Sequence, residues 1–263
     1  MTHSPALPER RPACVLLHSS MSSRSQWSAL MAQQENHLRC LAPDLLGYGK
    51  APFPDEATHA TFSLEHEVQA ILAALDGQLQ TGEPFHLVGH SYGGATALRL
   101  ARHMPERILS LALFEPVAFH LLAPENPARA EIAAVIARID AAASPREGAQ
   151  AFIDYWNGAG AFAALPEAMQ ARFTGLIAKV RLDFVALLGE PATLRDMAAL
   201  DIPTLVLFGR DGPLSTRTVA EELAAALPHA AMHRTPGGHM APLTHAADVN
   251  AVIGQFLAAA TEA

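Results

Sequence analysis

The pentapeptide at residues 89–93, GHSYG, constrains this chain more than any other feature. An apolar run at 85–88 precedes it, and small residues with helical spacing follow it. A G-x-S-x-G sequence between a strand and a helix is typical of a nucleophile elbow, a turn so tight that its serine adopts a strained backbone and exposes its hydroxyl. Glycines are expected on both sides because strand and helix leave no room for a Cβ. The pattern predicts Ser91 as a nucleophile; the alternative is a glycine-rich turn with an incidental serine.

The bulk properties limit the class of protein. The chain has 263 residues, half of them hydrophobic, which fits one α/β domain with an inserted subdomain. Its net charge of −8 argues against nucleic acid and anionic membrane surfaces as partners. No signal sequence or membrane span is evident, so we expect a soluble cytoplasmic protein. Cys14 and Cys40 lie in or beside apolar runs and are expected to be buried free thiols.

Strand and helix patterns alternate along the chain. Strands are predicted at 13–17, 38–42, 85–88, 108–114, 204–208 and 231–234. The nearly continuous apolar run at 108–114 fits a central parallel strand that is buried on both faces. Helical patterns separate these strands, which predicts a doubly wound, mostly parallel α/β sheet.

A long helical block interrupts the alternation. Between 117 and 199 the pattern predicts helices near 127–142, 146–156, 166–188 and 191–199, without a strong strand. We therefore divide the chain into a leader (1–12), an α/β core (13–116 and 200–263) and a helical cap (117–199). The cap is expected over the C-terminal edge of the sheet, where loops carry the chemistry in such folds.

Four stretches in this order give the chain a resemblance to the α/β-hydrolase family over residues 13–258. They are LHSS at 17–20, APDLLGYG at 42–49, the elbow at 89–93 and GHM at 238–240. The resemblance implies that a serine nucleophile is activated by a histidine in the loop after the last strand.

The resemblance also assigns the base and the oxyanion hole. His239 takes the position of the base. The backbone N–H groups of Tyr92 and Ser20 take the positions of the oxyanion hole. The family usually has His-Gly where this chain has His18-Ser19, so Ser19 is expected to adopt a backbone geometry often given to glycine. His18 itself is expected to be a structural hydrogen-bonding residue.

Two carboxylates are candidates for the third member of the triad. In the family the acid commonly stands three residues after the glycine that ends the strand at 204–208, and here that position is Gly212. Asp211 precedes it and is our preferred acid, because it follows the strand that usually supplies the acid; a shift of the loop would bring it to His239. Glu115, after the strand at 108–114, is the alternative, since some relatives place the acid there. Either carboxylate would fix the tautomer of the imidazole.

Relatives usually carry two further strands before the position of His18, whereas here only about a dozen residues precede the strand at 13–17. We predict a sheet without those two strands, with the strand at 38–42 on its edge. An exposed edge strand invites pairing or needs cover. Either the proline-containing leader covers it or a second copy of the chain pairs with it in a homodimer.

A serine nucleophile suits acyl transfer from an ester, lactone or thioester. The cap holds many of the chain's few aromatic side chains, so we expect a small, apolar substrate and no cofactor or metal. The residues predicted to line its pocket are Phe119, Tyr155, Trp156 and Met240.

Three other functions share these features. Carbon–carbon bond hydrolysis would need a clamp for the substrate carboxylate, for which Arg181 and Arg195 are candidates. Hydroxynitrile lyase chemistry uses a similar triad. A ligand receptor or pseudo-enzyme is favoured by the ambiguous acid and by the His-Ser loop.

Overall fold

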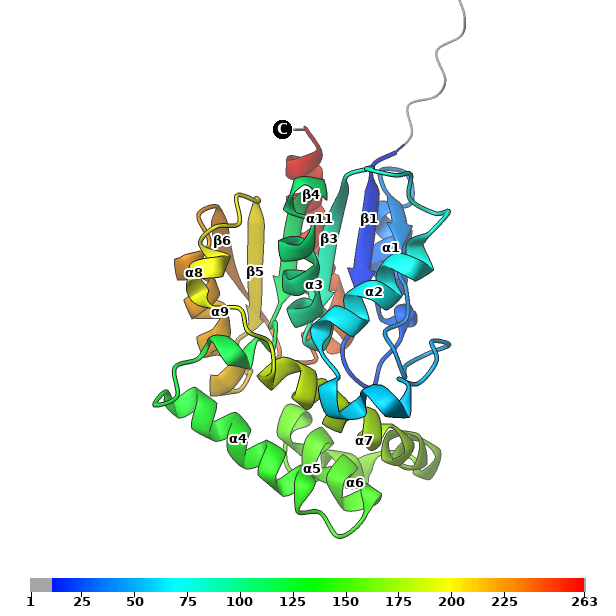
Figure 1. The fold of residues 1–263 in the computed structure, drawn as a ribbon, viewed down its shortest axis with the longest axis vertical. Helices are drawn as coiled ribbons and strands as arrows, with labels where there is room; N and C mark the ends of the chain where they lie inside the picture. The colour runs from blue at the N-terminus through cyan, green and yellow to red at the C-terminus, as the bar shows by residue number, and fades with distance from the viewer. Residues whose placement is uncertain (1–10, 263) are drawn as a thin grey trace, which may run out of the picture.

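The structure, a computed structural model, describes residues 11–262. At its centre lies a sheet of six strands in the order β2-β1-β3-β4-β5-β6 (Figure 1). All neighbouring strands are parallel. The predicted doubly wound parallel sheet is therefore confirmed, and each strand lies where the sequence indicated one. The strands are β1 (Ala13–Leu17), β2 (Arg39–Leu41), β3 (Phe85–His90), β4 (Ile108–Phe114), β5 (Thr204–Gly209) and β6 (Ala230–Thr235).

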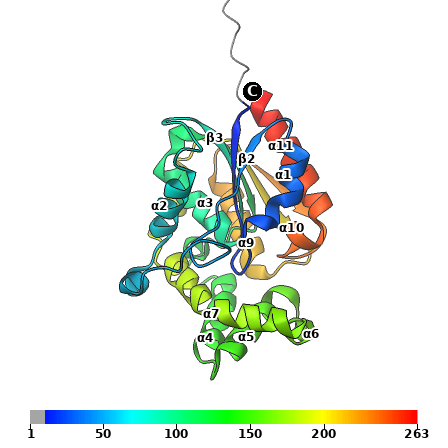
Figure 2. The same cartoon turned by 90° about the vertical axis from the view of Figure 1, so that its right-hand side faces the viewer.

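Helices cover both faces of the sheet (Figure 2). Alternate residues of β1 enter two separate cores: Val15 and Leu17 join one, and Cys14 and Leu16 join the other. The first core is closed by α2 (Leu64–Leu75), α3 (Tyr92–His103) and α9 (Leu214–Ala226). The second is closed by α1 (Ser28–Gln34) and α11 (Ala246–Glu262). Burial on both faces explains why the central strands read as continuous apolar runs.

Within residues 11–262, β2 forms one edge of the sheet and pairs with β1 alone. Its three residues are half-buried. The predicted edge position is confirmed, and the two further strands of relatives are not found in the described part of the chain. The carbonyl of Pro12 accepts a hydrogen bond from the Arg39 N–H (2.8 Å). The rest of the predicted leader, residues 1–10, lies outside the described residues, and pairing with a second copy stays a prediction.

Most of the helices between β4 and β5 lie beyond the C-terminal ends of the strands, whereas the last of them lies beside the sheet near β5 and β6 (Figures 1 and 2). We call residues 119–197 the helical block. Its longest member, α7, runs back from the far end of the block to the sheet. The segment predicted as a helix at 191–199 is helical only over α8, and the short α6 was not predicted. The elements are η4 (Phe119–Leu121), α4 (Pro127–Asp140), α5 (Pro145–Asn157), α6 (Ala161–Ala164), α7 (Glu167–Leu188) and α8 (Leu194–Met197).

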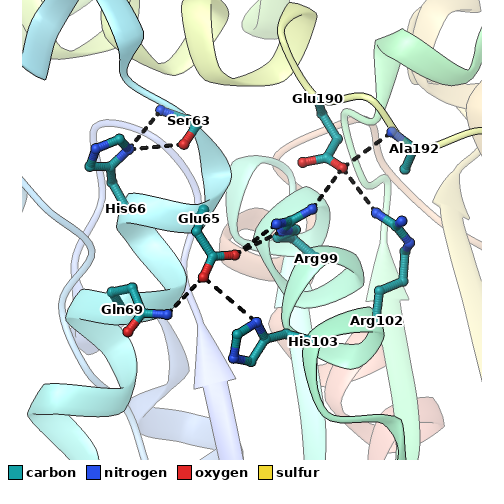
Figure 3. A network of polar contacts seen from close by, with 9 residues as sticks. All are labelled: Ser63, Glu65, His66, Gln69, Arg99, Arg102, His103, Glu190 and Ala192. Atoms are coloured by element: carbon teal, nitrogen blue, oxygen red, sulfur yellow. Dashed lines mark hydrogen bonds and ion pairs between the residues drawn. The ribbon is translucent and has the colours of Figure 1, made fainter.

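A network of ion pairs ties the end of the helical block to the helix that follows the elbow (Figure 3). Arg99 of α3 donates through Nε and Nη2 to Glu65 Oε2 of α2 (3.0 and 2.8 Å). Glu190, just after α7, accepts from Arg102 Nη1 (3.0 Å) and from the Ala192 N–H (3.3 Å). These bonds hold α2, α3 and the segment after α7 together.

The remaining elements are short: η1 (Arg24–Trp27), η2 (Glu56–Thr61), η3 (Pro105–Arg107) and α10 (Ala241–Thr244). In the part of the chain that the structure describes, no helix combines the length and the apolar character needed to cross a lipid bilayer.

Candidate active site

Ser91 lies at the sharp turn between β3 and α3. Its backbone has φ 56° and ψ −121°, a conformation that non-glycine residues rarely adopt. The flanking glycines are required by close packing, as expected. A Cβ on Gly89 would lie 2.5 Å from the carbonyl oxygen of Gly93, and a Cβ on Gly93 would lie 2.5 Å from that of Leu17. The turn therefore presents the serine hydroxyl at the C-terminal edge of the sheet.

His239 bridges Ser91 and a carboxylate. It lies in the loop after β6, with Nε2 2.9 Å from Ser91 Oγ and Nδ1 2.7 Å from Glu115 Oε2. All three side chains are buried, at 5%, 2% and 0% exposure for Ser91, His239 and Glu115. An ionised carboxylate only accepts hydrogen bonds, so Nδ1 carries the proton and Nε2 is free to accept the hydroxyl proton of Ser91.

Glu115 is held in place by the ends of two strands. It follows β4 directly, with a positive φ of 40°. Its N–H donates to the Leu207 carbonyl (2.8 Å), and its Oε1 accepts from the Gly209 N–H (2.8 Å). One carboxylate oxygen thus binds the backbone of β5 while the other faces His239. The structure places the alternative candidate, Glu115, in the position of the acid.

The preference for Asp211 is wrong on this geometry. Its side chain is 58% exposed and pairs with Arg210 (Nε to Oδ1, 3.1 Å), and the hydrogen bond from Arg210 lowers the pKa of Asp211. Its N–H instead donates to the Gly237 carbonyl (2.8 Å), which ties the turn after β5 to the histidine loop. A Cβ on the next residue, Gly212, would collide with Glu115 Oε1. The space that a side chain at 212 would occupy is filled by the Glu115 carboxylate.

The loop after β1 carries the second predicted oxyanion residue, Ser20. Ser19 does not have the glycine-like backbone that we expected; in this loop the positive φ belongs to Met21 (58°). The Ser19 N–H and hydroxyl donate to Gln26 Oε1 (3.1 and 3.0 Å), which anchors the loop to η1. Ser20 and Met21 line the cavity beside Ser91. A role of the Ser20 and Tyr92 N–H groups as oxyanion donors stays a prediction.

His18 is fully buried behind this loop. Its Nε2 accepts from the Leu45 N–H (3.0 Å), so Nδ1 carries the proton and donates to the Ser19 carbonyl (2.8 Å). Burial lowers the pKa of His18 to about 4. A neutral imidazole with both nitrogens engaged fits the structural role that the sequence predicted.

Two rings hold the imidazole of His239 in place. Trp156 of α5 stacks on it, with ring centroids 3.9 Å apart and planes inclined by 26°. His90 lies at a ring distance of 5.1 Å, and its Nε2 donates to the His239 carbonyl (2.9 Å). Burial lowers the pKa of His90 well below its usual value, so this ring is neutral and fixes the backbone of the histidine loop.

A cavity of about 420 Å³ opens beside Ser91 and His239. Of the four residues predicted to line it, Trp156 and Met240 do so. Phe119 does not, because it is fully buried in the core beneath the helical block. Tyr155 does not line it either: its hydroxyl bonds to Glu131 (2.7 Å) and to Ser215 (2.6 Å), and it borders a neighbouring cavity. Aromatic composition alone does not distinguish residues that face a cavity from those that pack the block.

Several lining residues were missed by sequence reasoning. Leu165, Met169 and Phe173 stand four residues apart on or beside α7, and together they form an apolar wall of the cavity. Among the described residues, Arg172 is the one arginine that lines it. The predicted clamps do not: Arg181 donates to the Ile139 carbonyl (2.8 Å), and Arg195 is not among the lining residues. The four-residue spacing was the signal that could have found the wall.

Metal ligation is not indicated at this site. Within residues 11–262, no group of three or more His, Cys, Asp or Glu residues could hold a metal ion.

Comparison with known proteins shows the family of the chain. A model of the alpha/beta hydrolase family matches residues 14–252. The chain belongs to this family. Relatives that are named as hydrolases match nearly the whole chain.

Individual relatives differ in how much of the chain they match. A protein provisionally named carbamate hydrolase RutD, from Variovorax paradoxus, is 34% identical over 97% of this chain and 94% of its own length. The 2-hydroxymuconate semialdehyde hydrolase of Pseudomonas sp. strain CF600 is 27% identical over 95% and 88%. A thermophilic esterase from Thermogutta terrifontis has a solved structure with a TM-score of 0.69 and 26% identity, over 95% and 91%. Matches to four other curated relatives, a lipase and two dehalogenases among them, span only 22% to 38% of those proteins.

Proposed function

We propose that this chain is a serine hydrolase that cleaves an ester, lactone or thioester through an acyl-enzyme. The observation that carries the proposal is the continuous hydrogen-bonded chain from Ser91 Oγ through His239 to Glu115, with links of 2.9 and 2.7 Å. Hydrogen-bond reach between nucleophile and base, with the base oriented by a third group, is the geometric signature of an activated serine.

In the acylation step the Ser91 oxygen attacks the substrate carbonyl. His239 Nε2 takes the hydroxyl proton and then gives it to the leaving group. Glu115 holds the tautomer with Nδ1–H and stabilises the imidazolium that forms. The face of Trp156 adds attraction for that cation, since an aromatic ring favours a positive charge above it. The backbone N–H groups of Tyr92 and Ser20 would bind the oxygen that becomes negative.

In the deacylation step a water molecule attacks the acyl carbon, and His239 Nε2 takes its proton and returns it to Ser91 Oγ as the bond between Oγ and the acyl carbon breaks and the acid leaves. The apolar wall of the cavity favours a small or medium-sized apolar acyl or alcohol group. In this proposal the helical block is a cap that closes the site, because residues of α5 and α7 line much of the cavity. The full-length similarity to RutD makes carbamates a further acyl class to test.

Carbon–carbon bond hydrolysis is the second candidate. The full-length similarity to 2-hydroxymuconate semialdehyde hydrolase favours it, and Arg172 is the lining cation that could bind a substrate carboxylate. The hydrogen bond between His239 and Glu115 argues against one of the two motivations for the receptor or pseudo-enzyme hypothesis, the ambiguous acid.

Turnover of a substrate panel tests the proposal. The unaltered chain and Ser91→Ala would be compared on p-nitrophenyl esters of increasing acyl length, a lactone, a carbamate ester and a diketone-type substrate of carbon–carbon bond hydrolases. We expect ester turnover that Ser91→Ala reduces by at least about 10³-fold. Ester turnover that survives in Ser91→Ala, or turnover of the diketone alone, would reject the esterase assignment.

A further inference from the structure

Directly behind the loop of Ser20 lies a buried cluster of three charges that the proposed mechanism does not use. Lys179 of α7 is fully buried, and its Nζ donates to Glu67 Oε1 of α2 (2.9 Å) and to Asp183 Oδ1, one turn further along α7. Both carboxylates are buried as well. We call Glu67, Lys179 and Asp183 the charge cluster.

The surroundings are adapted to hold this cation. The rings of Tyr48, Phe62 and Tyr92 lie 4.7 to 5.0 Å from Lys179 Nζ. Gly47, with φ 72°, leaves the space that the lysine stem fills, since its Cβ would lie 2.9 Å from Lys179 Cγ. Burial lowers the pKa of Lys179, but the two carboxylates outweigh burial and raise it, so the lysine stays charged. Burying ions is costly unless they are paired and hydrogen-bonded, so a cluster of this kind needs a reason.

The bonds that leave the cluster indicate that reason. Asp183 Oδ2 accepts from the Ser20 hydroxyl (2.5 Å), and Glu67 Oε1 accepts from the Tyr92 hydroxyl (3.1 Å). Ser20 and Tyr92 are the two residues whose backbone N–H groups are expected to form the oxyanion hole. Ser20 lies in the loop after β1 and Tyr92 is the first residue of α3, and their side chains meet in the same cluster.

We propose that the charge cluster positions the oxyanion hole, by holding Ser20 and Tyr92 through their side chains so that their backbone N–H groups keep a fixed separation. Glu67, Lys179 and Asp183 are positioning residues, because they act through Ser20 and Tyr92 and touch no reacting atom. Two of them belong to α7, so the cluster also couples the helical block to the hole. The inference rests on the proposed function.

Pre-organised donors stabilise the transition state far more than the bound substrate. An enzyme variant whose oxyanion-hole donors shift by a fraction of an ångström therefore has a lower kcat and a nearly unchanged KM. A role limited to holding the fold together would lower the melting temperature and leave kcat alone. The split between kcat and KM distinguishes the two.

The experiment compares Ser20→Ala and Tyr92→Phe with Tyr48→Phe on one p-nitrophenyl ester. All three variants remove a hydroxyl that donates to the cluster. Ser20→Ala and Tyr92→Phe keep the backbone N–H groups that are expected to form the oxyanion hole. Tyr48 is the matched control, because its hydroxyl donates to the same oxygen, Asp183 Oδ2, at the same 2.5 Å but does not belong to the hole. Lys179→Met alone is unsuitable, since it leaves two buried carboxylates without a cation.

We expect Ser20→Ala and Tyr92→Phe each to lower kcat about 10-fold or more with KM changed less than about 3-fold. They should weaken inhibition by a trifluoromethyl ketone, which forms an oxyanion on Ser91, by a similar factor. Tyr48→Phe should lower the melting temperature about as much as Ser20→Ala and Tyr92→Phe do, but it should change kcat less than about twofold.

The triple variant Glu67→Gln, Lys179→Met and Asp183→Asn removes all three charges at similar volume, and it should also lose kcat while folding. Equal kcat values in Ser20→Ala and Tyr48→Phe, or an unchanged kcat in the folded triple variant, would overturn the inference. Failure of the proposed function would appear differently, as absence of ester turnover in the unaltered chain.

Discussion

Replacing Glu115 by glutamine is the most informative single change, because the surrounding hydrogen bonds dictate how the new amide must lie. The Gly209 N–H needs an acceptor at the position of Oε1. The amide oxygen must therefore take that place, and its NH₂ group then occupies the position of Oε2, 2.7 Å from His239 Nδ1. An N–H donor at that point forces Nδ1 to accept, which moves the imidazole proton to Nε2.

The consequence can be put in numbers. With Nε2 protonated, His239 cannot take the proton of Ser91. Loss of the correct tautomer in a serine triad costs about 10⁴ in kcat, which corresponds to about 5 kcal/mol of transition-state stabilisation. Glutamine fills the volume of glutamate and keeps the bond from Gly209, so the fold should stay intact.

The assay is kcat/KM for the best ester at pH 8, with Asp211→Asn as the matched control. The Asp211 side chain is exposed and bonds to Arg210, so its variant should keep activity within about twofold. The reasoning is refuted if Glu115→Gln retains near-normal turnover, or if Asp211→Asn shows the larger loss.

Three other changes should have measurable effects. Gly212→Asp introduced into Glu115→Ala should recover at least about 10-fold of the lost kcat/KM, because the Cβ at 212 points at the vacated carboxylate position; a double variant no better than Glu115→Ala would contradict this. Gly93→Ala should destabilise the fold by about 3 kcal/mol or more in urea titrations, because its Cβ meets backbone; Gly175→Ala, which meets nothing within 4 Å in mid-helix, should be neutral or gain up to about 1 kcal/mol. Burial lowers the pKa of His18 and His86 to about 4, so the unfolded chain binds protons more readily than the folded chain, and the unfolding free energy present above pH 6.5 is lost as the pH falls toward 4. Each residue should lower the unfolding free energy by about 1.3 kcal/mol between pH 7.5 and pH 5.5, and equal unfolding free energies at the two pH values would contradict this.

The elements that could be predicted from sequence are those in which one local pattern has one physical outcome. Buried parallel strands read as apolar runs, and β2 lies at the edge of the sheet, as predicted. The elbow could be located because its steric demand falls on glycines at fixed spacing around Ser91. His239 was assigned from its place in the strand order, and its ring lies against Ser91.

The parts that were missed depend on contacts between distant segments. Asp211 and Glu115 both follow strands that lie side by side, and Glu115 reaches the histidine through space that a side chain at Gly212 would fill, while Asp211 pairs with Arg210. The cavity wall depends on how α5 and α7 pack, so aromatic content pointed to Phe119 and Tyr155, which pack or bond elsewhere. The charge cluster joins Glu67 to Lys179 across more than 100 positions, and its one local pattern is the four-residue spacing of Lys179 and Asp183.

Covalent labelling of Ser91 tests the central claim most directly. The chain would be treated with a fluorophosphonate, digested and analysed by mass spectrometry, with Ser91→Ala and Glu115→Gln alongside. The account predicts one adduct, on the peptide that contains Ser91, absent from Ser91→Ala and formed much more slowly in Glu115→Gln. An unlabelled chain, or an adduct on another residue that persists in Ser91→Ala, would contradict it.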